Sequence, residues 1–196
     1  MKKLLIFAAA ALFLMLAGCS AANDAAQDPV VTQQPTEAAS VKMTLNSSGI
    51  AGGIIDPAYG MKGKDITKGI PTLSIPLEIK GAPEGTKSYA VYMDDADSEP
   101  LCGYRWVHWM LVNAENNVIP EGFSQNAGSA VQGTNDFDTI GYGGPTPPDK
   151  NHTYKITVYA LDAKLSLAEG FSKEDFLEAI KGHVLDSASL EAVYEI

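Results

Sequence analysis

Short stretches of alternating apolar and polar residues recur along the chain from Val41 onward, and they predict β-strands. Such alternation places successive side chains on opposite faces of a strand. Leucine and isoleucine alternate weakly over 72–79, and a turn of glycine, alanine, proline and glutamate follows at 81–85. Further β-rich runs cover residues 87–93, 105–112, 153–161 and 190–196. The pattern therefore predicts a mainly β domain.

One helix is predicted late in the chain. Ser172 is a suitable N-cap, and Glu174 and Asp175 fall in the first turn, where the helix dipole favours negative charge. The apolar positions that follow have helical spacing and comprise Phe176, Leu177, Ile180 and Val184. Many strands with one late helix favour a β-sandwich that carries a peripheral helix.

The beginning of the chain predicts processing rather than folding. Lys2 and Lys3 precede an uncharged apolar stretch over 4–16, which is shorter than the roughly 20 residues of a membrane span. The stretch ends in Leu-Ala-Gly followed by Cys19, which is similar to the cleavage motif of bacterial lipoproteins. We expect residues 1–18 to be removed as a signal peptide and Cys19 to be acylated. The alternative is a secretory signal without lipidation.

These expectations place the protein in the bacterial cell envelope, lipid-anchored and extracytoplasmic. Residues 19–40 are rich in alanine, glutamine, threonine, proline and aspartate, which is typical of a flexible linker. The folded domain is then expected over 41–196. The second cysteine of the chain, Cys102, has no partner for an intrachain disulfide once Cys19 is lipidated, and we expect it to be a packed small side chain.

Charge excludes one class of partner. The formal charge of −10 becomes −12 when Lys2 and Lys3 are lost with the signal. A surface this acidic repels nucleic acid and anionic lipid headgroups at long range, so we expect no nucleic-acid partner. A small anion would have to be captured by a local pocket.

Three short motifs bring together the parts of such a pocket. They are Asp95-Ala96-Asp97, the strand 106–109 of sequence Trp-Val-His-Trp, and the loop 144–148 of sequence Gly-Pro-Thr-Pro-Pro, which leads to the sequence His-Thr-Tyr at 152–154. Alternation predicts that His108 shares a strand face with the residues two positions away, Trp106 and Met110, and that His152 shares one with Tyr154.

The chemistry of these residues favours an oxyanion. Histidine and tyrosine donate hydrogen bonds, the Thr146 backbone N–H is a further donor, and a carboxylate can orient an imidazole or accept from a protonated ligand. Two aspartates and two histidines can also ligate a divalent metal, but no His-x-x-x-His or Cys/His spacing is present. No nucleophile motif such as Gly-x-Ser-x-Gly occurs. We therefore expect binding without turnover, and no cofactor or resident metal.

Two other functions stay open at this stage. One is a metal- or histidine-assisted hydrolase that acts on a phosphoester. The other is a module that binds or inhibits a protein partner while its pocket is vestigial.

The motifs together resemble the phosphatidylethanolamine-binding protein family, in its bacterial branch of Raf-kinase-inhibitor-like proteins. The resemblance covers nearly the whole domain. Beside the three motifs above, it rests on the sequences Ile-Asp-Pro-Ala-Tyr at 55–59, Ser-Ile-Pro-Leu at 74–77, Gly-Thr-Lys-Ser-Tyr at 85–89, Tyr-Ala-Leu-Asp at 159–162 and Gly-His-Val-Leu at 182–185.

This resemblance implies a β-sandwich flanked by helices, with a small pocket for phosphoryl headgroups. It also implies the ligand-binding residues, with Asp97 as a supporting carboxylate: Asp95, Asp97, His108, Gly144, Pro145, Thr146, Pro147, His152 and Tyr154. The arginine often found between the histidine and tyrosine of the last motif is Thr153 here.

Overall fold

The computed structural model describes residues 42–196. The expected signal peptide 1–18, the lipidated Cys19 and the linker 19–40 lie outside the described residues and stay predictions. Within the described part of the chain, no helix is long and apolar enough to cross a membrane.

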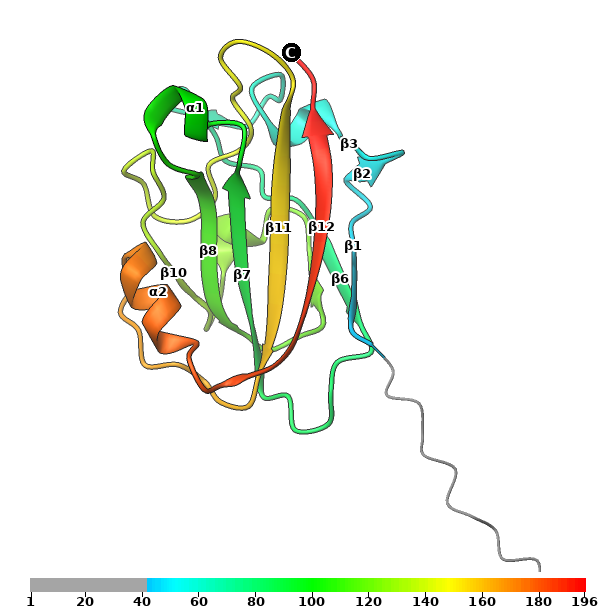
Figure 1. Ribbon diagram of the computed structural model, residues 1–196, viewed down its shortest axis with the longest axis vertical. Helices are drawn as coiled ribbons and strands as arrows, with labels where there is room; N and C mark the ends of the chain where they lie inside the picture. Colours follow the sequence, from blue (N-terminus) through cyan, green and yellow to red (C-terminus); the bar gives the residue numbers. More distant parts are fainter. Residues whose placement is uncertain (1–41) are drawn as a thin grey trace, which may run out of the picture. The chain divides into compact units, whose positions relative to one another are not determined.

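The main layer is a seven-stranded sheet in the order β10-β8-β7-β11-β12-β3-β2, and its long central strands run side by side in Figure 1. The pairs among β8, β7, β11 and β12 are antiparallel. The seven strands are β2 (Ile50–Ala51), β3 (Ile54–Ile55), β7 (Ser88–Asp95), β8 (Trp106–Ala114), β10 (Val131–Gln132), β11 (His152–Leu161) and β12 (Val184–Tyr194).

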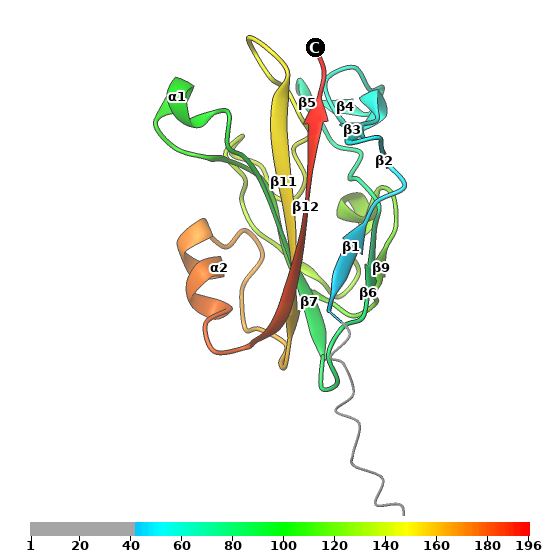
Figure 2. The ribbon, with the colours of Figure 1, turned by 45° about the vertical axis from the view of Figure 1, so that its right-hand side comes forward.

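A smaller sheet, in the order β1-β6-β9, forms a second layer beside the first (Figure 2). It comprises β1 (Thr44–Asn46), β6 (Leu77–Lys80) and β9 (Val118–Ile119). The predicted sandwich is confirmed. The remaining elements are a two-stranded sheet of β4 (Ile66–Thr67) and β5 (Ile70–Pro71), the 3-10 helices η1 (Pro57–Tyr59) and η2 (Phe123–Asn126), and the α-helices α1 (Glu99–Cys102) and α2 (Lys173–Ala179).

The predicted strand over 72–79 is shorter than expected, because only its end belongs to β6. Pro76 immediately precedes β6, and proline has no N–H with which to join a ladder of hydrogen bonds. The strands predicted at 87–93, 105–112 and 153–161 are present with small shifts at their ends.

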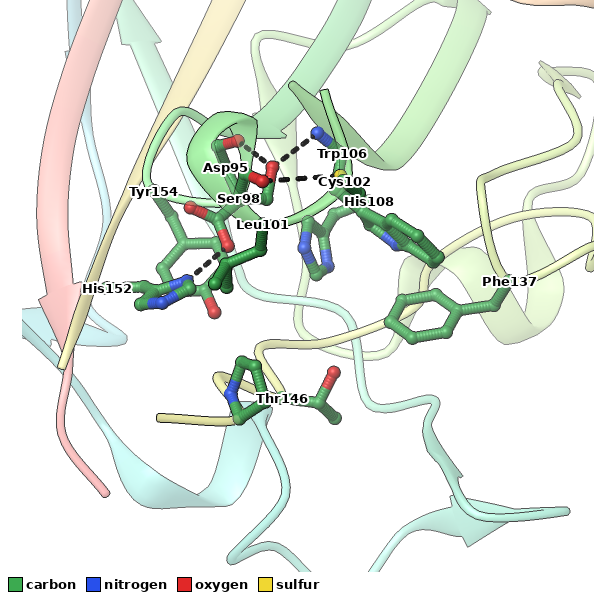
Figure 3. A pocket seen from close by; sticks show the side chains of 11 residues that line it. Asp95, Ser98, Leu101, Cys102, Trp106, His108, Phe137, Thr146, His152 and Tyr154 are labelled. Atoms are coloured by element: carbon green, nitrogen blue, oxygen red, sulfur yellow. Dashed lines mark hydrogen bonds and ion pairs between the residues drawn. The ribbon is translucent and has the colours of Figure 1, made fainter. Parts of the chain in front are cut away.

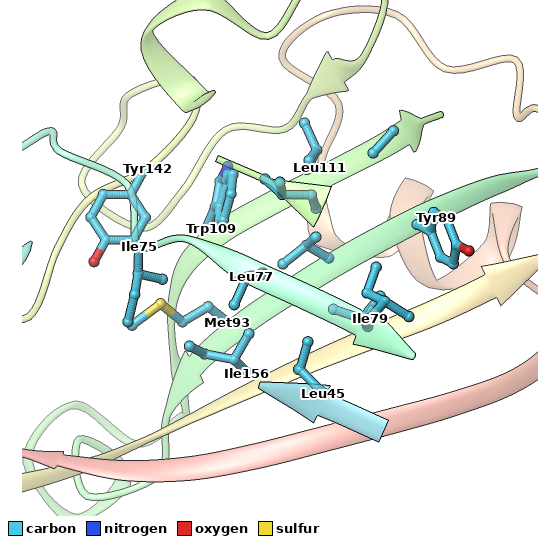
Figure 4. Close-up of a cluster of buried hydrophobic side chains, with 14 of the residues drawn as sticks. Leu45, Ile75, Leu77, Ile79, Tyr89, Met93, Trp109, Leu111, Tyr142 and Ile156 are labelled. Atoms are coloured by element: carbon cyan, nitrogen blue, oxygen red, sulfur yellow. The ribbon is translucent and has the colours of Figure 1, made fainter. Parts of the chain in front are cut away.

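The larger apolar core lies between the two sheets (Figure 4). Ile156, Val158 and Ala160 of β11 point into it, as their alternation predicts, and they meet Leu77 and Ile79 of β6. Each fully buried aliphatic side chain of this size contributes about 1.5–3 kcal/mol relative to an exposed one. This core fixes the sheets that carry the site at their ends.

A second apolar cluster lies between α2 and the large sheet. Figure 2 shows α2 on the face of this sheet that is turned away from the smaller sheet. Phe176 and Ile180 anchor the helix there. The predicted N-cap is confirmed, because the Ser172 hydroxyl accepts a hydrogen bond from the Asp175 N–H and the Asp175 carboxylate accepts one from the Ser172 N–H.

The prediction that the helix continues to Val184 is wrong. The helix ends at Ala179, Leu177 is 43 % exposed, and Val184 begins β12, which is six residues earlier than the predicted strand. Gly182, with φ of 78°, makes the turn between helix and strand possible. His183 therefore lies beyond the helix, where its Nδ1 contacts Asp162 Oδ1 at 2.8 Å.

Candidate functional site

A cavity of about 270 Å³ lies where β7, β8 and β11 meet the surrounding loops (Figure 3). The side chains that surround it come from these strands, from α1 and from the loops after β10 and before β11. They are Asp95, Ser98, Leu101, Cys102, Trp106, His108, Phe137, Thr146, Pro148, His152 and Tyr154.

An irregularity in β8 turns His108 toward this cavity. The register between β7 and β8 shifts between Met93 and Asp94, as at a β-bulge. Val107 and Met110 consequently pack in the same cluster beneath α2, whereas His108 lines the cavity. The prediction that His108 and Met110 share one strand face is wrong, because simple alternation does not hold across the bulge.

His108 is held as a neutral imidazole. Its Nδ1 lies 2.6 Å from the Gly143 carbonyl oxygen, so Nδ1 carries the proton and donates. The Gly143 N–H donates in return to the His108 carbonyl at 2.9 Å. Burial lowers the pKa of His108, and the bond to Gly143 only partly opposes this. Nε2 is then the polar atom that His108 presents to the cavity, as a hydrogen-bond acceptor.

His152, in contrast to His108, is held in its protonated form. Its Nδ1 lies 2.7 Å from Asp95 Oδ2, and its Nε2 lies 2.8 Å from Asp149 Oδ1. Two carboxylates can both accept only if both ring nitrogens carry protons, so this geometry favours the imidazolium. Burial alone would lower the pKa of His152, but the bonds to the two carboxylates outweigh it and raise the pKa above the ordinary value. Because both nitrogens are engaged, His152 supplies charge rather than a free donor.

Asp97 supports the site from outside the cavity. Its backbone N–H donates to Asp95 Oδ1 at 2.9 Å, and its own Oδ2 accepts from the Thr153 N–H at 2.8 Å. The Thr153 N–H, aided by Lys150, holds the pKa of Asp97 below its ordinary value. Asp97 thus joins the end of β7 to the start of β11, and the supporting role that the family resemblance implies for it stays a prediction.

Ser98 and α1 close the side of the cavity next to Asp95. The Ser98 hydroxyl donates to the Asp95 carbonyl at 2.7 Å and accepts from the Trp106 N–H at 2.8 Å. Leu101 and Cys102 project from α1 at the cavity wall. Cys102 is exposed, so the expectation of a packed thiol is wrong, because α1 lies at the surface and buries none of its residues.

Two polar atoms beside the cavity have no hydrogen-bond partner among residues 42–196. They are the Tyr154 hydroxyl and the Trp106 indole Nε1, and both are shielded from water. Burial raises the pKa of Tyr154, so its hydroxyl keeps its proton. The Thr146 N–H lies close enough to offset part of that rise, but it does not reach hydrogen-bonding geometry.

The loop 144–148 is fixed by backbone contacts. The Gly144 N–H donates to the Pro71 carbonyl at 2.9 Å, and a β-carbon on Gly144 would lie only 2.2 Å from the Tyr59 carbonyl oxygen. Of the predicted loop residues, Thr146 and Pro148 line the cavity, whereas Gly144, Pro145 and Pro147 are buried and do not line it.

Five wall residues and one supporting residue were not predicted as part of the site. Phe137 lies in an irregular loop that no periodicity marks, and its ring meets those of Trp106 and His108 at 5.3 Å and 5.4 Å. Asp149 lies only three residues before His152, so the short loop between them allows the contact that the structure shows. The other residues missed are Ser98, Leu101, Cys102 and Trp106.

Within residues 42–196, no group of three histidine, cysteine, aspartate or glutamate side chains is placed to hold a metal ion. The cavity combines two donors without partners in this part of the chain, Tyr154 and Trp106, with the neutral imidazole of His108. The carboxylate of Asp95 and the imidazolium of His152, which are bonded to each other, complete its polar groups.

Residues 46–195 match the family model described as phosphatidylethanolamine-binding protein. The chain belongs to this family. The match covers every described strand except the first residues of β1, so family membership confirms the resemblance drawn from the short motifs.

Similar proteins of the phosphatidylethanolamine-binding protein family have solved structures. A homologue from Chlamydia trachomatis, titled CT736, superposes with a TM-score of 0.70 at 34 % identity, over 80 % of this chain and 99 % of that one. Escherichia coli YbcL, titled a new member of the mammalian family, gives a TM-score of 0.67 at 31 % identity over 79 % and 99 %. A relative found by sequence, the uncharacterized protein YxkA of Bacillus subtilis, is 37 % identical over 66 % of this chain and 85 % of the YxkA chain.

Proposed function

We propose that this protein is a membrane-anchored, extracytoplasmic member of the family that binds a small ligand through a phosphoryl or other anionic group, without turning it over. The observation that carries the proposal is the pair of unpartnered donors, Tyr154 hydroxyl and Trp106 Nε1–H, in the wall of a cavity. A buried donor without an acceptor costs about 1–3 kcal/mol. Both atoms are shielded from water in this structure, so a ligand oxygen would remove that cost by displacing the side chains that cover them.

The surrounding contacts support binding rather than chemistry. The Ser98 hydroxyl and the Cys102 thiol at the cavity wall are both engaged by backbone groups. Neither His108 nor His152 forms a hydrogen bond with a hydroxyl or thiol among residues 42–196. A general base must reach the proton that it removes. Release of p-nitrophenol from p-nitrophenyl phosphate above the uncatalysed rate would contradict this part of the proposal.

The binding proposal is tested by thermal shift on the chain from residue 20 onward, which keeps every described element. A phosphomonoester at ten times its Kd should stabilise the fold by about 1.4 kcal/mol. For a domain of this size we expect a rise in Tm of roughly 3–6 °C.

Two tyrosine variants provide the specificity control. Tyr154→Phe should abolish the shift, because it removes one donor and almost no volume. Tyr142→Phe should retain the shift, because the Tyr142 hydroxyl donates to the Tyr59 carbonyl at 3.0 Å, away from the cavity. An absent shift in the unaltered protein at millimolar ligand would favour a protein-binding role instead.

The anchoring part of the proposal rests on the sequence around Cys19. Cys19→Ala should move the protein from the membrane fraction to the soluble fraction, since acylation needs the thiol. An unchanged distribution would contradict lipidation. Mass spectrometry of the mature N-terminus provides the control, because two or more acyl chains are needed for durable anchoring.

A further inference from the structure

The cavity offers acceptors as well as donors, and the two kinds of group constrain the protonation state of a ligand. Tyr154 hydroxyl and Trp106 Nε1–H are donors at the cavity wall without an acceptor in the described chain, and both can donate to a ligand oxygen once side-chain movement uncovers them. His108 Nε2 can only accept, because the proton of the neutral ring is committed to the Gly143 carbonyl. Asp95 is a carboxylate and also accepts.

A fully deprotonated phosphoryl or sulfuryl group has oxygens that only accept. If such a group met Tyr154 and Trp106, its lone pairs would also face those of Asp95, which is paired with both residues across the sheet, and those of His108 Nε2. A phosphoryl group that keeps one proton has an O–H, which can donate to either acceptor.

The charges around the cavity also favour a ligand with one negative charge over a ligand with two. No lysine or arginine is among the lining residues of the described chain. The one cation there, His152, is already paired with Asp95 and with Asp149. The other carboxylates around the two histidines are Asp94, Asp97 and Asp136. Arg105 pairs with Asp94, and Lys150 pairs with Asp97. The remaining titratable groups are the Tyr154 phenol and the Cys102 thiol at the wall.

We infer that the cavity selects a phosphoryl group carrying one proton, the monoanion of a phosphomonoester, over the dianion and over a sulfate ester. This inference rests on the proposed function and names the chemical state of its ligand. The aromatic rings of Trp106 and Phe137 lie on the same wall at 5.3 Å from each other, so an aryl ester is a suitable probe.

The test compares phenyl phosphate with phenyl sulfate by calorimetry on the full-length protein at pH 5 and pH 8. At pH 5 the two esters have the same ring and nearly the same charge, but only the phosphate carries a proton. Phenyl phosphate should bind and phenyl sulfate should not. With a second phosphate pKa of about 6, restriction to the monoanion weakens phosphate binding by about 90-fold between pH 5 and pH 8.

A third ligand shows where the proton resides. Phenylphosphonate has a higher second pKa than phenyl phosphate, so the midpoint of its pH dependence should move to higher pH if the ligand carries the proton. An identical midpoint for both ligands would assign the titration to a protein group and overturn the inference.

The remaining outcomes separate this inference from the proposed function. Phenyl phosphate that binds equally at both pH values, or phenyl sulfate that binds as tightly at pH 5, overturns the inference and leaves anion binding intact. The absence of binding by any of the three ligands overturns both. In Asp95→Asn, shown to be folded by its near-ultraviolet spectrum, the new amide can donate, and we expect phenyl sulfate to gain at least tenfold in affinity.

Discussion

The core between the sheets and the cavity at their end use the same two residue types in different ways. In the core, Trp109 Nε1–H donates to Gln132 Oε1 at 3.0 Å and the Tyr142 hydroxyl donates to the Tyr59 carbonyl. In the cavity wall, the corresponding groups of Trp106 and Tyr154 have no partner among residues 42–196. Buried polar groups are normally paired. The core thus gains stability from its polar groups, whereas the cavity wall leaves two of its own without a partner in the described chain.

The largest expected effect lies wholly on the core side of this comparison. Leu77→Ala removes a side chain that is 2 % exposed in the centre of the sandwich. We expect the free energy of unfolding, measured with urea, to fall by about 3 kcal/mol. Ligand affinity at a temperature where the variant is folded should be unchanged. A change in affinity of more than twofold would show that the two regions are energetically coupled.

The next effect concerns the loop that joins the two regions. Gly144→Ala would place a β-carbon 2.2 Å from the Tyr59 carbonyl oxygen, so the loop 144–148 must shift. Overpacking of this kind costs about 1–3 kcal/mol. Both stability and phosphomonoester affinity should decrease, because Thr146 moves with the loop. Loss of stability with full affinity would indicate that the position of Thr146 is unimportant.

The two tyrosines provide the sharpest form of the comparison, since one atom is removed in each case. Tyr142→Phe should cost about 1 kcal/mol, because it breaks a hydrogen bond and leaves the Tyr59 carbonyl unpaired. Tyr154→Phe should leave stability without ligand unchanged or raise it by up to about 1 kcal/mol, because an unsatisfied group is removed. Equal losses in urea titrations of the two variants would refute the contrast.

The smallest effect concerns pH. The pKa of His152 is raised in the folded state, so its contribution to stability is complete below the unfolded value of about 6.5 and is lost as pH rises through the folded value. Asp149→Asn removes one of the two carboxylates that raise it. Because Asp149 is partly exposed, we expect a loss of less than about 1 kcal/mol near pH 6.

The same variant has an internal control. The difference in the free energy of unfolding between Asp149→Asn and the unaltered protein should vanish near pH 10, where His152 is neutral in both. A loss of equal size at both pH values would mean that Asp149 acts through packing of its loop instead.

Sequence patterns predicted those parts of the fold that depend on local periodicity. The central strands and the cap at Ser172 follow from residues close together in the chain. The end of α2 was mispredicted because Val184 fits the apolar spacing of a helix and of a strand equally well, and the turn at Gly182 decides between them.

Motifs predicted several residues of the candidate site, and the residues that they missed are placed there by tertiary structure. Asp95, His108, His152 and Tyr154 line the cavity as expected. No local pattern indicates that a loop residue such as Phe137 packs against His108, since 29 positions separate them. Nor does any pattern reveal that a bulge redirects one strand, because its cause lies in pairing with the neighbouring strand.

The placement of the two tryptophans also gives this protein an intrinsic optical reporter. The chain has only two, with Trp109 fully buried in the core and Trp106 at the cavity wall. Fluorescence from the first should be insensitive to small solutes. That from the second should change in intensity and wavelength when the cavity is occupied, so ligands can be screened by emission without attaching a dye.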